Sequence, residues 1–358
     1  MTLILAFLVF IINGVIILKE FDIINQFFKT SVSSVDSSFV EAASVIKGIG
    51  DDCAILSVPE NHHLVVSMDT LVAGRHFPVD ALPEQIATRA FCTCLSDLAA
   101  MGATPRWFTL GLTLPSSDVE WIASFSKALL NIAQIYQCEL VGGDTTQGPM
   151  TLTLQVHGVV EMGKALRRDR AKIGDSVFVT GSLGDGAGAL ALINNDAMVN
   201  NIDEHQKKYL QERFYCPEPQ IEAGLKIIDF AHAAIDISDG LLADLQHIAA
   251  ASEVDISVDV ESIPLSLACK SLVGNAKALV YALSGGDDYQ IAFTVPDKHL
   301  ATVSELIKKE ELAATKIGKV VARGLSKNQY QVYCCKKDKK IEIKSILDGY
   351  KGYQHFAS

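Results

Sequence analysis

Short apolar segments with strand character alternate with segments of helical periodicity along most of the chain, and this alternation restricts the fold more than any other feature. Strands are expected at 63–68, 107–114, 139–141, 150–160, 176–180, 234–236 and 289–295. Helices are expected at 83–101, 118–137, 185–194, 203–213, 218–232 and 241–251. Because strands and helices interleave in both halves, the sequence predicts an α/β (α+β) fold.

The length and composition predict two domains with a large core. The chain has 358 residues, of which 49% are hydrophobic and 20% charged, and domains usually hold about 100–200 residues. A basic segment at 164–172 interrupts an otherwise acidic chain, so we place the boundary there, between domains at 19–164 and 165–358. The net charge of −11 argues against a nucleic-acid-binding protein, which needs a basic face.

Residues 1–18 form an apolar extension with three possible origins. They lack the basic start of a signal peptide, and they are short of the roughly 20 apolar residues of a membrane span. We favour a segment upstream of the true translation start, with a membrane segment as the alternative. Eight cysteines without a CxxC pair predict neither a disulfide framework nor a zinc site, and a cytoplasmic location fits best.

Aspartates recur at the expected ends of strands and helices, several beside paired glycines. The positions are Asp51, Asp52, Asp69, Asp97, Asp144, Asp236, Asp239, Asp287 and Asp288. One such aspartate alone is most often a turn residue or a helix cap. Together, carboxylates without accompanying histidine or cysteine ligands favour Mg²⁺, which is usually shared with phosphate oxygens. The pattern therefore predicts a site for a magnesium–nucleotide complex.

Two other nucleotide-binding motifs are not supported. Residues 158–165 match a P-loop until Ala165, which lacks the hydroxyl that binds Mg²⁺. Gly184, Gly186 and Ala189 make a degenerate dinucleotide motif that reads equally well as a glycine-rich turn before a helix. An NAD-dependent oxidoreductase is therefore disfavoured.

Nine motifs in order resemble those of the thiamine-monophosphate kinases, a family related to aminoimidazole ribonucleotide synthetase and selenophosphate synthetase. They are GIGDDCAIL (48–56), SMDTLVAGRHF (67–77), CLSDLAAMGATP (94–105), LVGGDTT (140–146), LRRDRAKIGD (166–175), VTGSLGDGAGAL (179–190), DISDGLLADL (236–245), LSGGDDYQIAF (283–293) and GYQHF (352–356). The resemblance implies a two-domain fold of the aminoimidazole ribonucleotide synthetase type, with an N-terminal sheet that joins its mate across a homodimer. It also implies Mg²⁺-dependent phosphorylation of thiamine monophosphate by ATP, in the biosynthesis of thiamine diphosphate.

The resemblance also assigns residues by position. The implied Mg²⁺ ligands, for several ions, are Asp52, Ser67, Met68, Asp69, Asp97, Asp144, Asp236 and Asp239. The implied ATP contacts are Gly143, Asp144, Arg168 and Ser238, and the implied contacts to thiamine monophosphate are His76, Asp287 and Tyr353. Met68 can offer hard Mg²⁺ only its backbone carbonyl. No catalytic base is expected, because a phosphate monoester is already largely a dianion at neutral pH.

Three departures from the family pattern matter, and the first of them concerns the affinity for the substrate more than the class of reaction. Asp287 stands where glutamate is usual, Cys94 where asparagine is usual, and Tyr353 where tryptophan or phenylalanine is commoner. Two alternatives therefore stay open. The first alternative is that the chain is another ATP-dependent enzyme of the same superfamily. The second is that it is a nucleotide-binding protein without catalytic activity.

Overall fold

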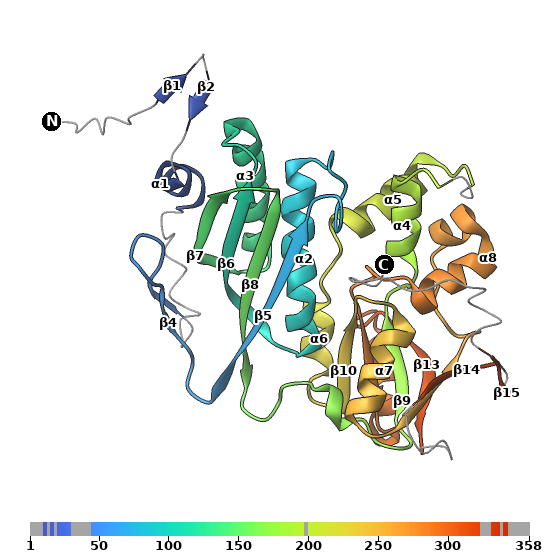
Figure 1. Cartoon of the computed structure of the whole chain (residues 1–358). Helices are drawn as coiled ribbons and strands as arrows, with labels where there is room; N and C mark the ends of the chain where they lie inside the picture. Colours follow the sequence, from blue (N-terminus) through green and yellow to red (C-terminus); the bar gives the residue numbers. More distant parts are fainter. Residues whose placement is uncertain are drawn as a thin grey trace. The chain divides into compact units, whose positions relative to one another are not determined.

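The computed structural model describes residues 10–12, 15–17, 20–29, 44–196, 200–322, 331–336 and 339–342 (Figure 1). The chain forms two compact units. Unit 1 comprises Met1–Cys94 and Pro105–Val159, and unit 2 comprises Leu95–Thr104 and Val160–Ser358. The mixed arrangement of helices and sheets confirms the predicted α/β class, whereas the domain limits at 19–164 and 165–358 stay a prediction.

Unit 1 is built on a four-stranded sheet in the order β5-β8-β6-β7. Its strands are β5 (His62–Val72), β6 (Thr104–Leu114), β7 (Glu139–Gln147) and β8 (Thr151–Glu161). Helices α2 (Pro83–Ala100) and α3 (Val119–Ile135) lie on one face of the sheet (Figure 1). Their contact with the sheet includes an edge-to-face pair of Phe91 and Phe108, with ring centroids 5.1 Å apart.

Smaller elements precede this sheet. They are β1 (Phe10–Ile12), β2 (Val15–Ile17), α1 (Glu20–Ile23), the π-helical turn η1 (Ile24–Phe28), β3 (Ser44–Lys47) and β4 (Ile55–Ser57). Val45, Ala54 and Leu56 around the β3–β4 hairpin pack on a buried cluster that contains Trp107 and Val141. The hairpin thus covers apolar sheet residues and positions the loop that carries Asp52.

Unit 2 contains a seven-stranded sheet in the order β10-β12-β9-β13-β11-β14-β15. Its strands are β9 (Ser176–Thr180), β10 (Ala233–Ile237), β11 (Asp255–Asp259), β12 (Gln290–Val295), β13 (Ala314–Val321), β14 (Val332–Lys336) and β15 (Lys339–Lys340). Its helices are η3 (Arg168–Arg170), α4 (Asp185–Ile193), α5 (Glu204–Tyr215), α6 (Ile221–Ile227), α7 (Leu241–Ala251), α8 (Leu267–Ser284), η4 (Asp297–His299) and α9 (Leu300–Lys308).

Burial explains why the central strands of unit 2 are so apolar. Every residue of β9, β10 and β12 is buried, so these strands read as continuous apolar runs instead of alternating ones. Leu241, Leu245 and Ile248 of α7 share a core with these strands. A second core forms between α4, α5 and α8. The loops that leave the buried strands are therefore held on a rigid base.

Several predicted boundaries are wrong. The strand expected to end at residue 141 continues to Gln147, so Gly143 and Asp144 lie within β7 and not after it. The helix expected at 218–232 is only α6. None of the described helices is both long and apolar enough to span a membrane.

Candidate active site

In unit 2 a tight turn joins β10 to α7 and carries two of the predicted site residues, Ser238 and Asp239. The carboxylate of Asp244, in the first turns of α7, organises it. One oxygen, Oδ2, accepts the backbone N–H groups of Ser238, Asp239 and Gly240, each at 3.1 Å. Asp244 is buried, whereas Asp239 is exposed. Asp244 therefore holds the turn from inside while the Asp239 carboxylate faces solvent.

Asp236 lies at the end of β10 beside two residues of helix α2. It is buried, and its Oδ2 accepts a hydrogen bond of 2.9 Å from the hydroxyl of Ser96, which is fully buried. Burial, followed by the nearby charge of Asp97, raises the pKa of Asp236, while the Ser96 hydrogen bond and Arg168 act in the opposite direction. The structure thus brings Asp97 and Arg168 within electrostatic range of Asp236.

Carboxylates in this part of unit 2 repel one another. Burial and then Asp239 raise the pKa of Asp244 to about 7, although three backbone N–H groups oppose that shift. Asp244 in turn adds to the raised pKa of Asp236. A bound cation would relieve this repulsion, and oxygen donors without histidine or cysteine suit Mg²⁺.

The loop between α8 and β12 runs directly alongside this turn. The backbone N–H of Asp287 donates to the Ser238 carbonyl at 2.9 Å, and that of Tyr289 donates to the Ile237 carbonyl at 2.8 Å. The Tyr289 hydroxyl donates to Oδ1 of Asp287 at 2.8 Å. A predicted substrate residue and a predicted ATP residue are therefore neighbours on adjoining backbone segments.

In unit 1, strand β5 carries Ser67, Met68 and Asp69. Side chains alternate along a strand, so Ser67 and Asp69 share one face and Met68 points to the other. Met68 is 59% exposed and follows Leu64 and Val66 on its face, which are 45% and 47% exposed. The Met68 side chain thus lies on the face opposite to those of Ser67 and Asp69, and its role in metal binding stays a prediction.

Strand β7 carries Gly143 and Asp144 at the opposite edge of the sheet. A β-bulge beside Val141 shifts the register between β6 and β7, and Asp144 then pairs with Gly111. Gly143 must be glycine, because a Cβ there would lie 2.0 Å from the carbonyl oxygen of Leu110. Two strands separate Asp144 from Asp69, about 14 Å at the usual strand spacing. The sheet therefore does not bring these two carboxylates onto one ion.

The remaining predicted residues of unit 1 lie in loops. Nδ1 of His76 accepts the backbone N–H of Val72 at 3.0 Å, and the His76 carbonyl accepts a hydrogen bond from buried Arg89 at 2.9 Å. A neutral His76 ring therefore carries its proton on Nε2. Asp52 is exposed, after the β3 strand. Tyr353 lies outside the described residues, so its predicted role is not addressed by the structure.

Within the described ranges, no three His, Cys, Asp or Glu residues are arranged to hold a metal ion by themselves. Mg²⁺ typically takes one or two carboxylates and completes its shell with water and substrate phosphates. The carboxylates of each unit, Asp97, Asp236 and Asp239 in one and Asp52, Asp69 and Asp144 in the other, fit such incomplete sites. The eight metal ligands stay a prediction.

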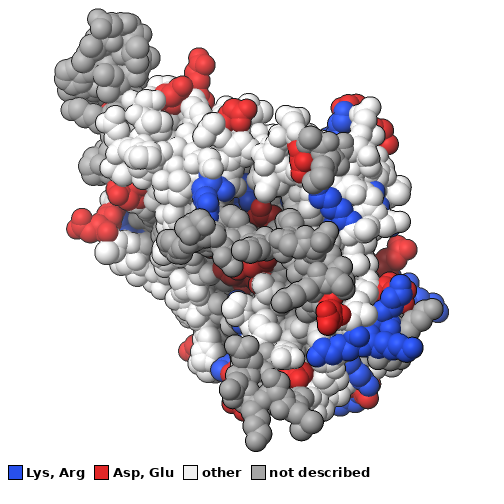
Figure 2. Space-filling model, turned by 45° about the vertical axis from the view of Figure 1, so that its right-hand side comes forward, with Lys and Arg blue, Asp and Glu red and all other residues white. Residues whose placement is uncertain are grey.

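The largest group of Lys and Arg side chains on the face in Figure 2 lies at its lower right. Lys336, Lys339 and Lys340 on β14 and β15 are exposed. Lys336 pairs with Glu261 at 3.1 Å, and Lys340 lies 4.6 Å from the ring centroid of Tyr333. Lys336 and Lys340 thus have partners within unit 2.

Three supporting residues escaped the sequence analysis, namely Ser96, Asp244 and Tyr289. Each lies within a motif that was singled out, next to or a few residues from a predicted site residue. The side-chain hydrogen bonds of Asp244 to its turn and of Tyr289 to Asp287 are local, within six residues along the chain. The contact of Ser96 joins it to Asp236, which is 140 residues away. Only the fold could reveal that pairing.

Comparison with known proteins agrees with this geometry. Family models described as the AIR synthase related protein N-terminal and C-terminal domains match residues 50–160 and 172–331. Thiamine-monophosphate kinase of Escherichia coli (strain K12) is 41% identical over 339 residues, covering 95% of this chain and 98% of that protein. A crystal structure of thiamine-monophosphate kinase from Stenotrophomonas maltophilia K279a matches with a TM-score of 0.75 and 41% identity, over 82% of this chain and 92% of the other.

A further solved structure, described as AaThiL complexed with AMPPCP and TMP, is 31% identical. Its TM-score is 0.70, and the match covers 83% of this chain and 88% of that chain. The two domain models, the 41% identity to a thiamine-monophosphate kinase over nearly the full chain and the solved structures thus confirm the resemblance and the two-domain fold. The chain belongs to the thiamine-monophosphate kinase family of AIR synthase related proteins.

Proposed function

We propose that this chain transfers the γ-phosphoryl group of ATP to thiamine monophosphate and so makes thiamine diphosphate. The observation that carries the proposal is the junction of two loops in unit 2. Asp287, in the loop expected to meet the acceptor, is hydrogen-bonded through its backbone to Ser238, beside the acidic turn expected to meet ATP. The residues expected to recognise donor and acceptor thereby lie on adjoining backbone segments, and a relative in the family carries AMPPCP and TMP.

In this proposal two groups of predicted ligands hold Mg²⁺ for the bound nucleotide, and each group lies within one unit. In unit 2 they are Asp97, Asp236 and Asp239, and in unit 1 they are Asp52, Ser67, Asp69, Asp144 and, through its backbone carbonyl, Met68. When bound, Mg²⁺ neutralises phosphate charge and orients the γ-phosphoryl group. Ser96 keeps the Asp236 carboxylate in one orientation, and Arg168, close to Asp236, contributes a fixed positive charge.

On the acceptor side, His76, Asp287 and Tyr353 bind thiamine monophosphate. Nε2–H of His76 is the ring's donor, because Nδ1 is occupied by Val72. The attacking phosphate needs no base, since it is largely dianionic at neutral pH. The protein's part is to hold two polyanions in line, so transfer is direct and no residue becomes phosphorylated.

A homodimer through strand β5 completes the proposal. β5 is an edge strand of 11 residues, and Leu64, Val66 and Met68 on one of its faces are about half exposed. A long apolar edge strand is unfavourable in water unless it pairs or is covered. A second copy of unit 1 provides such a cover. We also propose a cytoplasmic location, which is supported by the lack of disulfide bonds among the described residues.

The test is to incubate the full chain with ATP, Mg²⁺ and thiamine monophosphate and to separate the products by chromatography. Thiamine diphosphate that disappears with EDTA and returns with added Mg²⁺ supports the reaction and its metal dependence. ATP binding without product from thiamine monophosphate would favour the alternative of a non-catalytic protein, and product from a different phosphorylated acceptor would favour another enzyme of the superfamily.

A further inference from the structure

The loop expected to recognise the acceptor is held in an unfavourable backbone conformation. Asp287 and Tyr289 have φ angles of +67° and +49°, in the left-handed region that is unfavourable for a residue with a side chain. One of these residues directly precedes Asp288 and the other directly follows it. A loop with this geometry persists only when surrounding contacts fix it, so the contacts made by Asp288 decide where the Asp287 carboxylate lies.

Asp288 anchors the loop to the first turn of helix α4. Its side chain is fully buried, and its two carboxylate oxygens accept the N–H groups of Gly184 at 2.7 Å and Gly186 at 3.0 Å. These N–H groups have no partner within an α-helix, and the positive end of the helix dipole favours a carboxylate there. Asp288 therefore acts as a helix cap supplied by a segment that is about 100 residues away in sequence.

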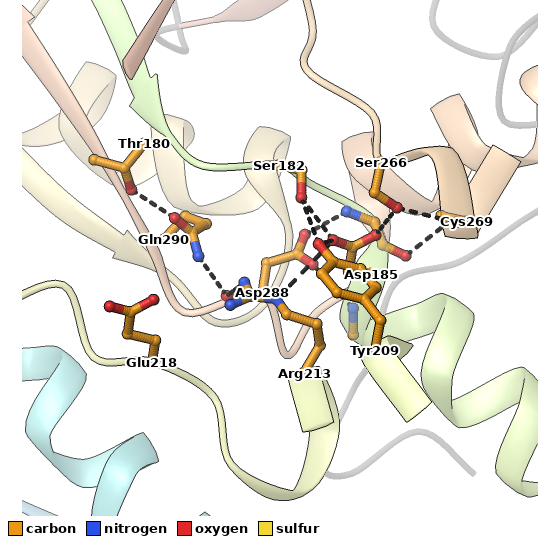
Figure 3. Close-up of polar contacts among 12 residues, drawn as sticks. Thr180, Ser182, Asp185, Tyr209, Arg213, Glu218, Ser266, Cys269, Asp288 and Gln290 are labelled. Atoms are coloured by element: carbon orange, nitrogen blue, oxygen red, sulfur yellow. Dashed lines mark hydrogen bonds and ion pairs between the residues drawn. The ribbon is translucent and has the colours of Figure 1, made fainter. Parts of the chain in front are cut away.

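Arg213 of helix α5 ties down the same loop from another side (Figure 3). Its Nη2 donates to the backbone carbonyl of Asp288 at 3.1 Å, and its Nε lies 4.0 Å from Oδ2 of Asp185. Asp185 is also fully buried, and it accepts hydrogen bonds from three hydroxyls, those of Ser182, Tyr209 and Ser266. Arg213 thus donates to the loop through Nη2, while its buried Nε makes an ion-pair contact with Asp185 without a hydrogen bond.

A close steric contact completes the arrangement. A Cβ on Gly186 would lie 2.4 Å from the carbonyl oxygen of Asp287. The first turn of α4 therefore touches the backbone of Asp287 itself, while its N–H groups hold Asp288. On the other side, Asp287 donates its N–H to Ser238. The backbone of Asp287 is held between α4 and the β10–α7 turn.

We propose that Asp288, with Arg213 and the first turn of α4, is a positioning device for acceptor recognition, which we call the Asp288 brace (Gly184, Gly186, Arg213, Asp288). The proposal rests on the proposed function, in which Asp287 binds thiamine monophosphate. Asp287 has a short side chain, so its carboxylate follows its backbone closely. The brace fixes that backbone and thereby sets the affinity for the acceptor, whereas the turn that holds ATP is organised separately by Asp244.

The test uses two variants that disturb the brace in different ways. Asp288→Asn replaces one of the two acceptor oxygens by an amide group that cannot accept a backbone N–H, and Gly186→Ala pushes on the Asp287 carbonyl while leaving the Asp288 carboxyl group in place. For each we expect the KM for thiamine monophosphate to rise about tenfold, as for the loss of one well-made interaction, with kcat and the KM for ATP within about twofold. Amide hydrogen exchange at 184–187 and 285–289 should become faster in Asp288→Asn.

Asp175→Asn is the matched control. Asp175 is also buried, and it accepts the N–H of Lys172 at 2.9 Å and contacts His232. It precedes β9, about 16 Å along that strand from the segment that leads into α4. We expect Asp175→Asn to lower the melting temperature without changing the KM for thiamine monophosphate.

The outcomes are distinguishable. If the wild-type chain makes no thiamine diphosphate, the proposed function is refuted. If, in addition, amide hydrogen exchange is no faster in Asp288→Asn than in the wild type, the proposal of the Asp288 brace is refuted as well. If the wild type is active and both brace variants keep a normal KM for thiamine monophosphate, the brace is refuted while the function stands. An equal rise in the KM values for ATP and thiamine monophosphate would also refute it, because it would indicate general loosening of the site.

Discussion

Replacing Ser96 by alanine tests whether Asp236 must be held in a fixed orientation. The Ser96 hydroxyl donates to Asp236 at 2.9 Å, and both side chains are buried, so no bulk water can replace the lost donor. A hydrogen bond to a charged group contributes about 1.5–3 kcal/mol, and this range corresponds to about 10–150-fold in an equilibrium constant. Residues that orient metal ligands typically change metal affinity or activity by about 10–100-fold.

We therefore expect Ser96→Ala to raise the Mg²⁺ concentration needed for half-maximal activity by at least about tenfold. The assay is the initial rate of thiamine diphosphate formation at saturating substrates, as Mg²⁺ is varied. Ser126→Ala is the control, because the Ser126 hydroxyl is also buried but donates only to the Ala123 carbonyl within helix α3. An unchanged Mg²⁺ dependence in Ser96→Ala would refute the reasoning that Asp236 is a ligand held by Ser96.

Three further predictions concern the metal ligands, the dimer and pH. Asp97→Asn and Asp239→Asn should each lower turnover at least about 100-fold with unchanged circular dichroism, and near-normal turnover in both would contradict the assignment of metal ligands. Val66→Lys on β5 should give a monomer by light scattering, whereas Ile135→Glu on α3 should keep the dimer; a Val66→Lys dimer would exclude β5 as the interface. Burial, followed by the nearby charge of Asp185, raises the pKa of Asp288 from 3.8 to about 7. Between these two pH values the folded state therefore keeps a proton on Asp288 that the unfolded chain has lost. The unfolding free energy of the wild type relative to Asp288→Asn should therefore fall as the pH rises from about 4 to 7, and a constant difference in denaturant titrations would contradict the raised pKa.

The sequence predicts the elements of this fold best where one periodicity dominates. Helix α7 and strand β9 have the predicted limits, because glycine or polar turns border each of them. Strand β7 was predicted too short, since Gly142 and Gly143 read as a turn. In the structure these glycines continue the strand past a bulge, where β6 approaches too closely for any side chain at Gly143. Such a contact depends on a neighbouring strand and has no local signal.

For the candidate site, too, local patterns in the sequence identify residues but not their contacts with distant segments. The motifs identify Asp236, Ser238, Asp239 and Asp287 as special, because acidic residues beside glycines recur at the ends of elements. They do not show that the loops of Asp287 and Ser238 are hydrogen-bonded to each other. Equally, Asp288 reads as a second acidic residue of its motif, while the fold makes it a buried cap for a distant helix. Roles that depend on long-range packing cannot be predicted from spacing alone.

The most direct test of the account follows the phosphoryl group itself. The chain is incubated with ATP labelled in its γ-phosphoryl group, Mg²⁺ and thiamine monophosphate, and the labelled products are separated and quantified. We predict that the label appears in the terminal phosphate of thiamine diphosphate, with one ADP formed for each labelled product and no labelled protein. Label released as inorganic phosphate, or retained on the protein as a covalent phosphoenzyme, would contradict direct transfer to thiamine monophosphate.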